Sequence, residues 1–276
     1  MGILKAGLIG EHISRTRLPA ALKIMCEMHG LTLEFVLIDT AELPGFDFTA
    51  TVDDLRAQRW TGVTVTHPYK TNAADYAGNG MLPDLRRLGA CNTLIFGNEL
   101  GGHNTDFTGF IGAWQARMAQ PPGRVVMAGA GGVAHALGPA LARLGAAEIA
   151  IFDTDPARAT NLAALIGPVA MALPAGGAGK AIEQADGLVN ATPLGMREYP
   201  GSAFEPAHLG PQSWAFDAVY TPADTQFLLD ARAAGLTTLS GFSLFQHMAI
   251  GSFAAYTGIT VDAAAVLPKL DALKPE

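Results

Sequence analysis

Cysteine and basic residues are both scarce in this sequence. Only two of its 276 residues are cysteine, which argues against a disulfide framework and leaves too few thiols for a structural zinc site, so no metal site is expected. Lys and Arg number 18 against 25 Asp and Glu, for a formal net charge of −7. Nucleic-acid-binding proteins carry a basic surplus, so we expect no nucleic-acid partner. A few local cations or backbone N–H groups still suffice to bind an acidic metabolite.

Long apolar runs are absent as well. No stretch of about 18 apolar residues occurs, so we expect no membrane-spanning helix. Met1 to Gly10 lack the charged start and the long apolar run of a signal peptide, and we therefore predict a cytoplasmic protein. The chain is 49% hydrophobic and long enough for two domains. No visible pattern sets the oligomeric state, so a monomer and a homodimer both stay open.

Predicted strands and helices alternate along the chain. Apolar strands in repeated strand–helix units predict parallel sheets covered on both faces. The expected strands are Leu4–Ile9, Leu33–Leu37, Gly62–Thr66, Asn92–Phe96, Val125–Ala128, Ile149–Phe152, Leu188–Val189, Ala215–Tyr220 and Thr237–Leu239, with a turn at Gly97-Asn98. The expected helices run from Pro19 to Gly30, Val52 to Gln58, Ala134 to Leu144, Thr225 to Ala234 and Ser243 to Tyr256, and Pro174 to Lys180 reads as a surface loop.

A dinucleotide fingerprint follows the strand at Val125–Ala128. Gly129-x-Gly131-x-x-Ala134 fits the G-x-G-x-x-G/A pattern, with a strand before it and a helix after it. The first glycine permits the tight turn, the second lets the backbone approach a pyrophosphate, and Ala134 keeps the helix close to the sheet. The N–H groups at the start of the helix would face the phosphates. The sequence therefore predicts a Rossmann-type cofactor domain.

Asp153 decides the expected cofactor. It follows the second strand of this unit, where a carboxylate accepts hydrogen bonds from the ribose hydroxyls and repels a 2′-phosphate. Arg158 lies one helical turn further on and offers partial compensation for a phosphate. NAD is therefore favoured, and NADP stays open as a second cofactor. In the plainer alternative, Asp153 caps the helix that starts near Pro156.

Three polar clusters lie outside the fingerprint. Lys70 comes just past a strand end, beside a Pro turn and at the start of the next helix, which favours a catalytic role over a solvated surface charge. Asn92 lies in Gly89-Ala-Cys-Asn-Thr93, and Asp106 in Gly102-His-Asn-Thr-Asp106. On sequence physics alone, Asn92 and Asp106 fit an ordinary turn or cap role equally well.

Taken together, these segments resemble the shikimate dehydrogenase family over essentially the whole chain. The His-Pro-Tyr-Lys form and the acidic Asp153 are most similar to the NAD-using quinate/shikimate dehydrogenase branch, since NADP enzymes of the family typically carry Asn-Arg-Thr where this chain has Asp153-Thr-Asp155. Seven blocks occur in the family's order: Thr64-Val-Thr-His-Pro-Tyr-Lys70, Gly89-Ala-Cys-Asn-Thr93, Asn104-Thr-Asp106 with Gly109-Phe110, Gly129-Ala-Gly-Gly132, Asn190-Ala-Thr-Pro-Leu-Gly-Met196, Asp217-Ala-Val-Tyr-Thr-Pro222 and Phe253-Ala-Ala-Tyr-Thr-Gly258.

The resemblance implies an NAD(P)-dependent alcohol dehydrogenase. It would interconvert the ring hydroxyl and ketone of shikimate- or quinate-type acids, with Lys70 and Asp106 as the catalytic pair. Chemistry agrees, because a lysine of lowered pKa can take the hydroxyl proton while Asp106 orients it and binds the hydroxyl. The implied substrate contacts are Thr16, Thr66, Asn92, Tyr220 and Met248. The expected cofactor contacts are Gly129, Ala130, Gly131, Gly132, Val133, Asp153, Arg158, Asn190, Thr192, Pro193, Leu194, Met196, Val219 and Gly241.

The resemblance also implies the domain plan. Residues 1–102 would form a smaller α/β substrate domain and residues 103–239 the Rossmann domain, with a cleft between them. Residues 240–276 would supply C-terminal helices that return to the substrate domain.

Two positions depart from the family pattern. The family usually holds the substrate carboxylate with two hydroxyls, as Ser-x-Ser or Ser-x-Thr before a Pro. Counting without gaps from Pro19 matches these to Thr16 and Leu18, while a two-residue shift would use Ser14 and Thr16 instead. We expect the gapless register. The family's substrate-binding glutamine falls on Met248.

Two lost polar contacts would weaken turnover of shikimate itself. Each removed hydrogen-bond partner costs about 1–3 kcal/mol, or roughly tenfold or more in affinity. One alternative is therefore a paralogue that acts on a substituted, for example amino, shikimate analogue. Another is a non-catalytic NAD-binding regulator, against which the intact Lys70, Asn92 and Asp106 argue. His247, beside Met248, is expected to be a packed or surface histidine.

Overall fold

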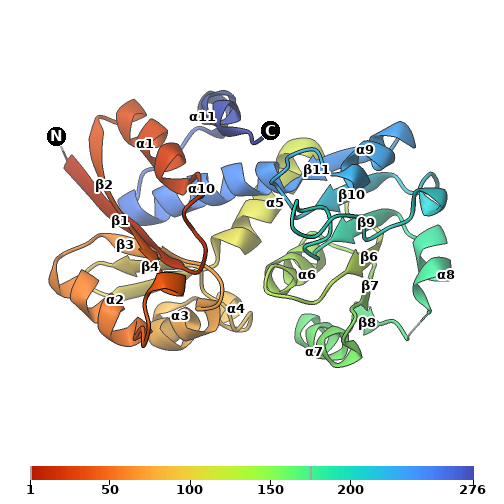
Figure 1. The fold of residues 1–276 in the computed structure, drawn as a ribbon, viewed down its shortest axis with the longest axis horizontal. Coiled ribbons are helices and arrows are strands. Elements are labelled where there is room, and N and C mark those ends of the chain that lie inside the picture. Colours follow the sequence, from red (N-terminus) through yellow and green to blue (C-terminus); the bar gives the residue numbers. More distant parts are fainter. Residues whose placement is uncertain (1, 175) are drawn as a thin grey trace. The chain divides into compact units, whose positions relative to one another are not determined.

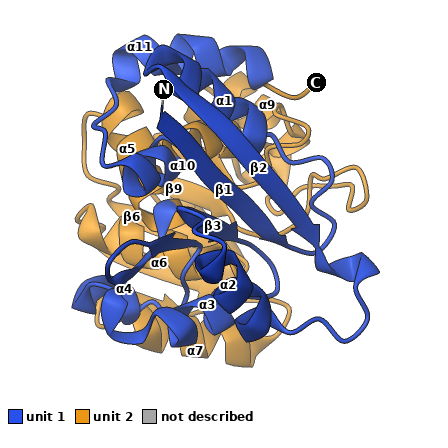
Figure 2. Ribbon diagram, turned by 90° about the vertical axis from the view of Figure 1, so that its left-hand side faces the viewer, with its two compact units in different colours: residues 1–105, 248–273 blue, residues 106–247, 274–276 orange. Residues whose placement is uncertain are grey.

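The computed structural model describes residues 2–174 and 176–276. The chain divides into two compact units, coloured separately in Figure 2. The first unit holds the residues up to 105 together with 248–273, and the second holds 106–247 together with 274–276. Helices α5 (Thr105–Arg117) and α10 (Gly241–Thr257) each begin in one unit and continue in the other.

The first unit is built on a five-stranded sheet in the order β2-β1-β3-β4-β5, of which Figure 1 labels the first four strands. β1, β2 and β3 are parallel, whereas β4 runs antiparallel to both of its neighbours. The alternation of strands and helices did not predict this reversal. The short turn between β4 and β5 accounts for the antiparallel pairing of these two strands, because a parallel return needs a crossover of about a dozen residues. The strands are β1 (Gly2–Gly10), β2 (Leu31–Asp39), β3 (Gly62–Val65), β4 (Thr93–Phe96) and β5 (Leu100–His103).

This topology gathers several polar segments at one edge of the sheet. The parallel strands β1, β2 and β3 end there, at Gly10, Asp39 and Val65. The antiparallel β4 begins at the same edge, with Thr93 paired to Thr64, and β5 ends there with His103 paired to Thr93. The residues that follow β1 and β3, precede β4 and follow β5 are therefore neighbours in space.

Helices pack on this sheet through regularly spaced apolar residues. In α1, the buried Leu18, Ala21, Leu22 and Met25 follow the three- and four-residue spacing of one helical face. A proline in its first turn is pre-set for a helix start. The helices of this unit are α1 (Leu18–Met28), α2 (Phe48–Ala57), α3 (Lys70–Ala77), α4 (Pro83–Arg86) and α11 (Ala263–Leu270), together with the latter part of α10.

The second unit contains a six-stranded, fully parallel sheet in the order β11-β10-β9-β6-β7-β8. Counted from β6, this is the 3-2-1-4-5-6 order of doubly wound dinucleotide-binding folds, in which ligands bind at the carboxyl ends of the strands where the order reverses. The reversal lies between β6 and β9. The strands are β6 (Arg124–Ala128), β7 (Glu148–Phe152), β8 (Ala170–Ala172), β9 (Gly187–Asn190), β10 (Trp214–Asp217) and β11 (Thr237–Ser240), and the helices besides α5 and α10 are α6 (Ala134–Arg143), α7 (Pro156–Ile166), α8 (Ala178–Glu183) and α9 (Gln226–Ala233).

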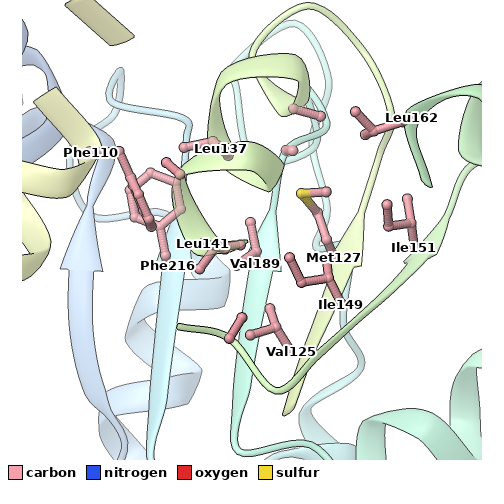
Figure 3. Packing of buried hydrophobic residues seen from close by; sticks show 14 of the residues in the cluster. Phe110, Val125, Met127, Leu137, Leu141, Ile149, Ile151, Leu162, Val189 and Phe216 are labelled. Carbon is pink, nitrogen blue, oxygen red and sulfur yellow. The ribbon is translucent and has the colours of Figure 1, made fainter. Parts of the chain in front are cut away.

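Two apolar clusters cover this sheet. One joins residues of α5, α6 and α7 to the strands, including Phe110, Leu137 and Val189 (Figure 3). Phe110 meets Phe216 edge-on, with ring centroids 4.9 Å apart. The other cluster packs α8 and α9 against the sheet through Ile182 and Phe227, together with Phe204 of the segment after β9. The central strands β6, β9 and β10 are therefore buried on both faces, as their near-continuous apolar sequences predict.

Several boundaries differ from the sequence-based expectation. The strand expected to reach Tyr220 ends at Asp217, and α10 begins at Gly241. Of the expected loop 174–180, Ala175 lies outside the described residues, and the part from Ala178 onward belongs to α8. Among the described residues, no helix combines the length and the apolarity needed to span a membrane.

Candidate active site

Asn92 accepts several hydrogen bonds at the end of the first unit's sheet where β1, β2 and β3 end. Asn92 is only 2% exposed. Its side-chain Oδ1 accepts hydrogen bonds from the Thr105 N–H at 2.7 Å, the Thr105 Oγ1 at 3.0 Å and the Thr93 Oγ1 at 3.1 Å. A backbone N–H can only donate, so the atom that faces Thr105 N must be the amide oxygen. The Nδ2 of Asn92 is therefore the atom left to donate to a ligand.

The two proposed catalytic positions are attached to Cys91 and Asn92 through the backbone. Lys70 is the first residue of α3, and its carbonyl accepts the Cys91 N–H at 2.9 Å. Asp106 directly follows Thr105, whose N–H is bound to Asn92. The adjacent residues Cys91 and Asn92 thus hold the start of α3 on one side and the start of α5 on the other.

A line of close polar contacts connects Asn92 to Met248. Thr105 Oγ1 lies 3.1 Å from Ser252 Oγ, and Ser252 Oγ lies 3.6 Å from Met248 Sδ. Ser252 and Thr105 are both buried. The structure therefore brings two of the expected substrate-contacting positions to the two ends of one network. The bridging residues were not singled out from the sequence, because a serine in an apolar helix gives no signal of a partner 147 residues away.

The loop after β1 carries the remaining expected contacts of this unit. The Asp39 carboxylate holds it by accepting the N–H groups of His12 at 2.9 Å and Ile13 at 3.0 Å. Burial works to raise the pKa of Asp39, but these backbone hydrogen bonds outweigh it and keep the pKa below its usual value. Thr16 is half-buried and Ser14 is exposed, at the same edge where Thr66 follows β3.

Leu18 is the residue that the gapless register matches to a substrate-binding hydroxyl. It is the first residue of α1 and only 2% exposed, packed in the interior of the unit. A side chain so enclosed offers almost no surface to a substrate. The hydroxyls left on this loop are those of Ser14 and Thr16, so the structure favours the shifted register. The Thr16 Oγ1 also accepts the Leu18 N–H, at 3.3 Å.

The Cys91 thiol and the Tyr256 hydroxyl are buried near Asn92 and stay protonated at neutral pH. Burial raises the pKa of the Cys91 thiol to about 11, so the thiol stays protonated and is a poor nucleophile. The Tyr256 hydroxyl lies 2.6 Å from Thr64 Oγ1, and burial raises its pKa well above the usual value. Both groups fix packing rather than supply acid–base chemistry near neutral pH.

The glycine turn of the second unit is tightly packed at Gly129 and open at Gly131 and Gly132. Gly129 has φ +93°, and a Cβ there would lie 2.9 Å from the Ala191 carbonyl, so only glycine fits. Cβ atoms built on Gly131 or Gly132 meet nothing within 4 Å, which leaves open space over the turn before α6. Ala134 is fully buried at the start of that helix. Ala130 and Val133 complete the turn.

Asp153 lies at the carboxyl end of β7 and faces this turn. Its Oδ2 accepts the Ala130 N–H at 2.7 Å, and its Oδ1 accepts the Asp155 N–H at 2.8 Å. Burial acts to raise the pKa of Asp153, but the two backbone donors, with Thr154 and the charge of Arg158, hold it below its usual value. The carboxylate is therefore ionised at neutral pH. The capping alternative is wrong in detail, because Asp155 caps α7 by accepting the Ala157 N–H.

Arg158 does not form a phosphate clamp in this structure. Its side chain is 65% exposed and its Nε lies 3.6 Å from the Asp155 carboxylate. The neighbouring acid thus competes with a phosphate for the Arg158 guanidinium, which is consistent with a preference for a cofactor without a 2′-phosphate.

The segment Asn190–Met196 is folded around the Asn190 side chain. The Asn190 Oδ1 accepts the N–H and hydroxyl of Thr192 at 3.0 and 2.6 Å, and its Nδ2 donates to the Leu194 carbonyl at 2.9 Å. Asn190 is fully buried, so it can act on a cofactor only by shaping this loop. Pro193 and Met196 close the turn through a Met196 N–H to Pro193 carbonyl bond at 3.1 Å.

Two further expected positions lie beyond β10 and β11. Val219 donates its N–H to Asp217 Oδ1 at 2.9 Å. Gly241 is packed so closely that a Cβ there would clash with the Ala218 carbonyl oxygen and lie 2.8 Å from that of Val219. Glycine at 241 thus lets the start of α10 approach the loop that follows β10.

Tyr220 and His247 are both in packed surroundings. The Tyr220 ring stacks on Phe245, with centroids 5.7 Å apart and an interplanar angle of 8°. A Cβ on Gly112 would lie 2.8 Å from His247 Nδ1, which shows how closely the imidazole packs on α5. Burial lowers the pKa of His247, in keeping with the expected packed histidine.

Comparison with known proteins identifies the class of fold. The family model described as "Shikimate dehydrogenase substrate binding domain" matches residues 8–94, within the first unit. The quinate/shikimate dehydrogenase (NAD(+)) of Corynebacterium efficiens is 38% identical over 266 residues, which covers 93% of each chain. By this likeness the chain belongs to the shikimate dehydrogenase family.

Solved structures give the same assignment. Quinate dehydrogenase from Corynebacterium glutamicum, in complex with NAD, superimposes with a TM-score of 0.91 at 32% identity and covers 98% of this chain and 99% of that one. Shikimate 5-dehydrogenase from Thermus thermophilus, in complex with NADP(H) and shikimate, gives a TM-score of 0.85 at 28% identity, with coverage of 98% and 99%.

Proposed function

We propose that this chain catalyses the NAD-dependent interconversion of a ring hydroxyl and its ketone in a quinate- or shikimate-type acid. The observation that carries the proposal is the double attachment at Cys91 and Asn92. One residue binds the Lys70 carbonyl and the other binds the Thr105 N–H, next to Asp106. Residues far apart in sequence, of the types that the reaction needs, are held by one dipeptide.

The second unit supplies the cofactor site. The open space over Gly131 and Gly132 fits a pyrophosphate at the start of α6, and the ionised Asp153 fits the ribose hydroxyls. The nicotinamide, when bound, accepts the hydride that leaves the substrate carbon. NAD is the preferred cofactor because the Asp153 carboxylate repels a 2′-phosphate and Arg158 is paired with Asp155. NADP is the weaker substitute.

The first unit supplies the proton chemistry. Oxidising an alcohol requires removal of its O–H proton as hydride leaves the carbon, and Lys70 takes that proton. Asp106 binds the same hydroxyl and orients the lysine. The Asn92 Nδ2, whose partner oxygen is fully used inside the protein, donates to a neighbouring ring hydroxyl. Thr66 lines the same pocket.

The loop after β1 holds the carboxylate end of the substrate. We assign this role to the hydroxyls of Ser14 and Thr16, since Leu18 is enclosed in the interior. We assign Tyr220 as a further substrate contact, and Met248 covers the ring where the family has a glutamine. Residues 1–102 then act as the substrate domain and 103–239 as the cofactor domain, with 240–276 returning to the first; the family-model match at 8–94 supports this division.

A matrix of substrates and cofactors tests the proposal. Quinate, shikimate and an amino-substituted shikimate analogue are each assayed with NAD and NADP by the absorbance of the reduced nicotinamide. We expect turnover of quinate or shikimate, faster with NAD than with NADP. Turnover of the amino analogue alone would favour the substituted-substrate alternative that Met248 suggests. No turnover of any ring acid, with NAD binding retained, would favour the regulator and contradict the proposal.

Lys23→Ala provides a matched control for Lys70→Ala. Lys23 is 70% exposed in α1 and lies 3.9 Å from Glu27, so its loss removes a surface charge of the same unit and nothing more. A cytoplasmic location remains a prediction from the sequence, and a monomer and a homodimer both stay open. Cell fractionation and light scattering on the purified protein would check them.

A further inference from the structure

Asp217 is a fully buried acid that the proposed reaction does not use. Asp217 is the last residue of β10 and is 0% exposed. Among the described residues, no charged group contributes to the pKa of its carboxyl. Burial raises the pKa of its carboxyl to about 6, against the lowering effect of hydrogen bonds from Thr225, Val219 and Asn190. Burying an ionisable carboxyl without a neighbouring cation lowers the stability of the fold. The three groups that donate hydrogen bonds to Asp217 indicate which segments it holds in place.

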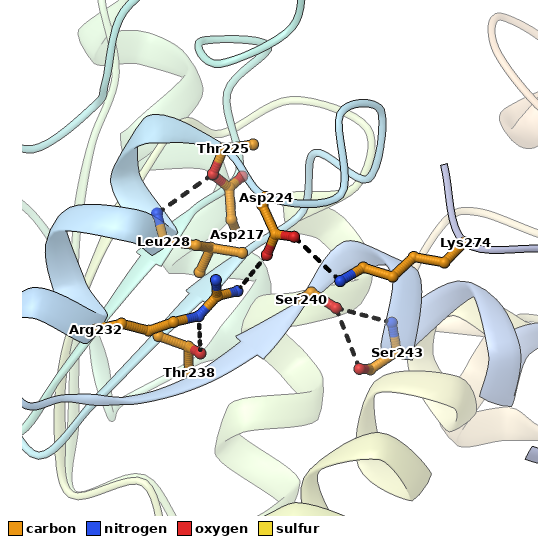
Figure 4. Close-up of polar contacts among 9 residues, drawn as sticks. All are labelled: Asp217, Asp224, Thr225, Leu228, Arg232, Thr238, Ser240, Ser243 and Lys274. Atoms are coloured by element: carbon orange, nitrogen blue, oxygen red, sulfur yellow. Dashed lines mark hydrogen bonds and ion pairs between the residues drawn. The ribbon is translucent and has the colours of Figure 1, made fainter. Parts of the chain in front are cut away.

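The three donors come from three different segments. Asp217 Oδ1 accepts the Asn190 Nδ2 at 2.9 Å, from the end of β9, and the Val219 N–H at 2.9 Å, from the loop after β10. Asp217 Oδ2 accepts the Thr225 hydroxyl at 2.6 Å, at the start of α9. Figure 4 shows Asp217 beneath Thr225, with the Thr225 hydroxyl also bound by the Leu228 N–H at 3.4 Å.

The contact with Asn190 reaches the proposed cofactor loop. The same Nδ2 that binds Asp217 also binds the Leu194 carbonyl, and the Oδ1 of that amide fixes Thr192. Because an amide is planar, holding Nδ2 also sets the direction of Oδ1. A Cβ on Gly195 would lie 3.3 Å from Thr225 Cβ, so the loop rests directly on the Asp217–Thr225 pair.

We infer that Asp217 is a positioning residue for the cofactor: it orients the Asn190 amide and the Val219 backbone, and through them sets the shape of Asn190–Met196 against the nicotinamide half of NAD. The inference rests on the proposed function, which assigns that loop and Val219 to the cofactor. An asparagine at 217 has nearly the same shape but only one acceptor oxygen, so it cannot bind all three donors unless Thr225 reverses its hydroxyl. The carboxylate also makes each bond charge-assisted and therefore stronger.

Charged side chains on the surrounding elements are engaged elsewhere. Asp224, in the loop before α9, is bound by Arg232 at 2.6 Å and by Lys274 at 3.1 Å (Figure 4). Asp230 of α9 accepts the Gln226 side chain, and Arg197 and Glu198, beyond the cofactor loop, are exposed. None of these bonds involves Asp217. A change in NAD affinity that tracks the ionisation of Asp217 is therefore separable from the surface charges.

The test compares Asp217→Asn with Asp224→Asn, which removes an exposed acid from the loop between β10 and α9. The Kd for NAD alone is measured by calorimetry, with kcat and the melting temperature recorded for each protein. We expect Asp217→Asn to raise the Kd roughly tenfold while kcat at saturating NAD changes little, and Asp224→Asn to leave both unchanged. The wild-type Kd should rise as pH falls from 7 to 5, and this rise should disappear in Asp217→Asn.

A second variant keeps the inference testable if Asp217→Asn does not fold. Thr225→Val removes one donor to the carboxylate and should raise the Kd for NAD about threefold. Folded variants at Asp217 and Thr225 that bind NAD within twofold of wild type, with an unchanged pH profile, would overturn the inference and leave the proposed function standing. A wild-type protein that does not bind NAD would overturn the proposed function itself.

Discussion

Asp217→Asn should change how the stability of the protein depends on pH. The folded-state pKa of about 6 lies above the usual 3.8, so the folded protein keeps a proton that the unfolded chain has lost. The stabilising effect of that proton is complete below about pH 3.8 and is lost as pH rises through about 6. Integrating the two titrations, wild type should lose about 1.3 kcal/mol between pH 5 and pH 7 from this group alone, a loss that Asp217→Asn lacks.

Urea unfolding at pH 5, 6 and 7 measures this difference. Trp114 and Trp214 are packed edge-to-face with centroids 4.7 Å apart, in the same unit as Asp217, and their fluorescence reports the unfolding of that unit. All other titrating groups are common to wild type and Asp217→Asn. The change with pH in the difference between their free energies of unfolding therefore reports Asp217 alone. Equal pH slopes in wild type and Asp217→Asn would refute the burial argument.

Three further variants test the site. Asp153→Asn should raise the NADP-to-NAD ratio of kcat/KM roughly tenfold in steady-state assays, since the repelling charge is lost; an unchanged ratio would contradict the role of Asp153. Asn92→Asp keeps an oxygen for Thr105 but loses the Nδ2 donor, so the KM for the ring acid should rise about tenfold while the fold persists, as checked by circular dichroism. Gly241→Ala should lower the free energy of unfolding by about 1–3 kcal/mol, because its Cβ would meet backbone atoms of residues 218 and 219. Gly179→Ala, in α8 with nothing within 4 Å, is the control and should be neutral or stabilising, as measured by urea unfolding.

Local patterns in the sequence were sufficient for the cofactor turn. A strand, a glycine turn and a helix follow one another directly in the chain, so the positions of Gly129 in the turn, Ala134 at the helix start and Asp153 after the next strand could be predicted from the order of residues alone. Lys70 at the start of a helix was predicted for the same reason, since a Pro turn separates the strand from the helix. These features depend on neighbours in the chain.

Features that depend on distant partners could not be predicted. The sequence does not predict β5, because Leu100-Gly-Gly-His103 lacks the β-branched residues that are typical of strands. The antiparallel direction of β4, which places Asn92 at the same end of the sheet as Lys70, therefore could not be predicted either. The short α8, rich in alanine and glycine, resembled a loop. Leu18 was expected to replace a substrate contact, but its burial becomes visible only once α1 is packed on the sheet.

The most direct test of the account is the activity of Lys70→Ala on quinate or shikimate with NAD, measured beside Lys23→Ala. Removal of a general base lowers rates by about a hundredfold or more, so kcat/KM should fall by at least that factor while the Kd for NAD stays unchanged. Lys23→Ala should match wild type. Activity of Lys70→Ala within tenfold of wild type would contradict the assignment of the reaction to this site.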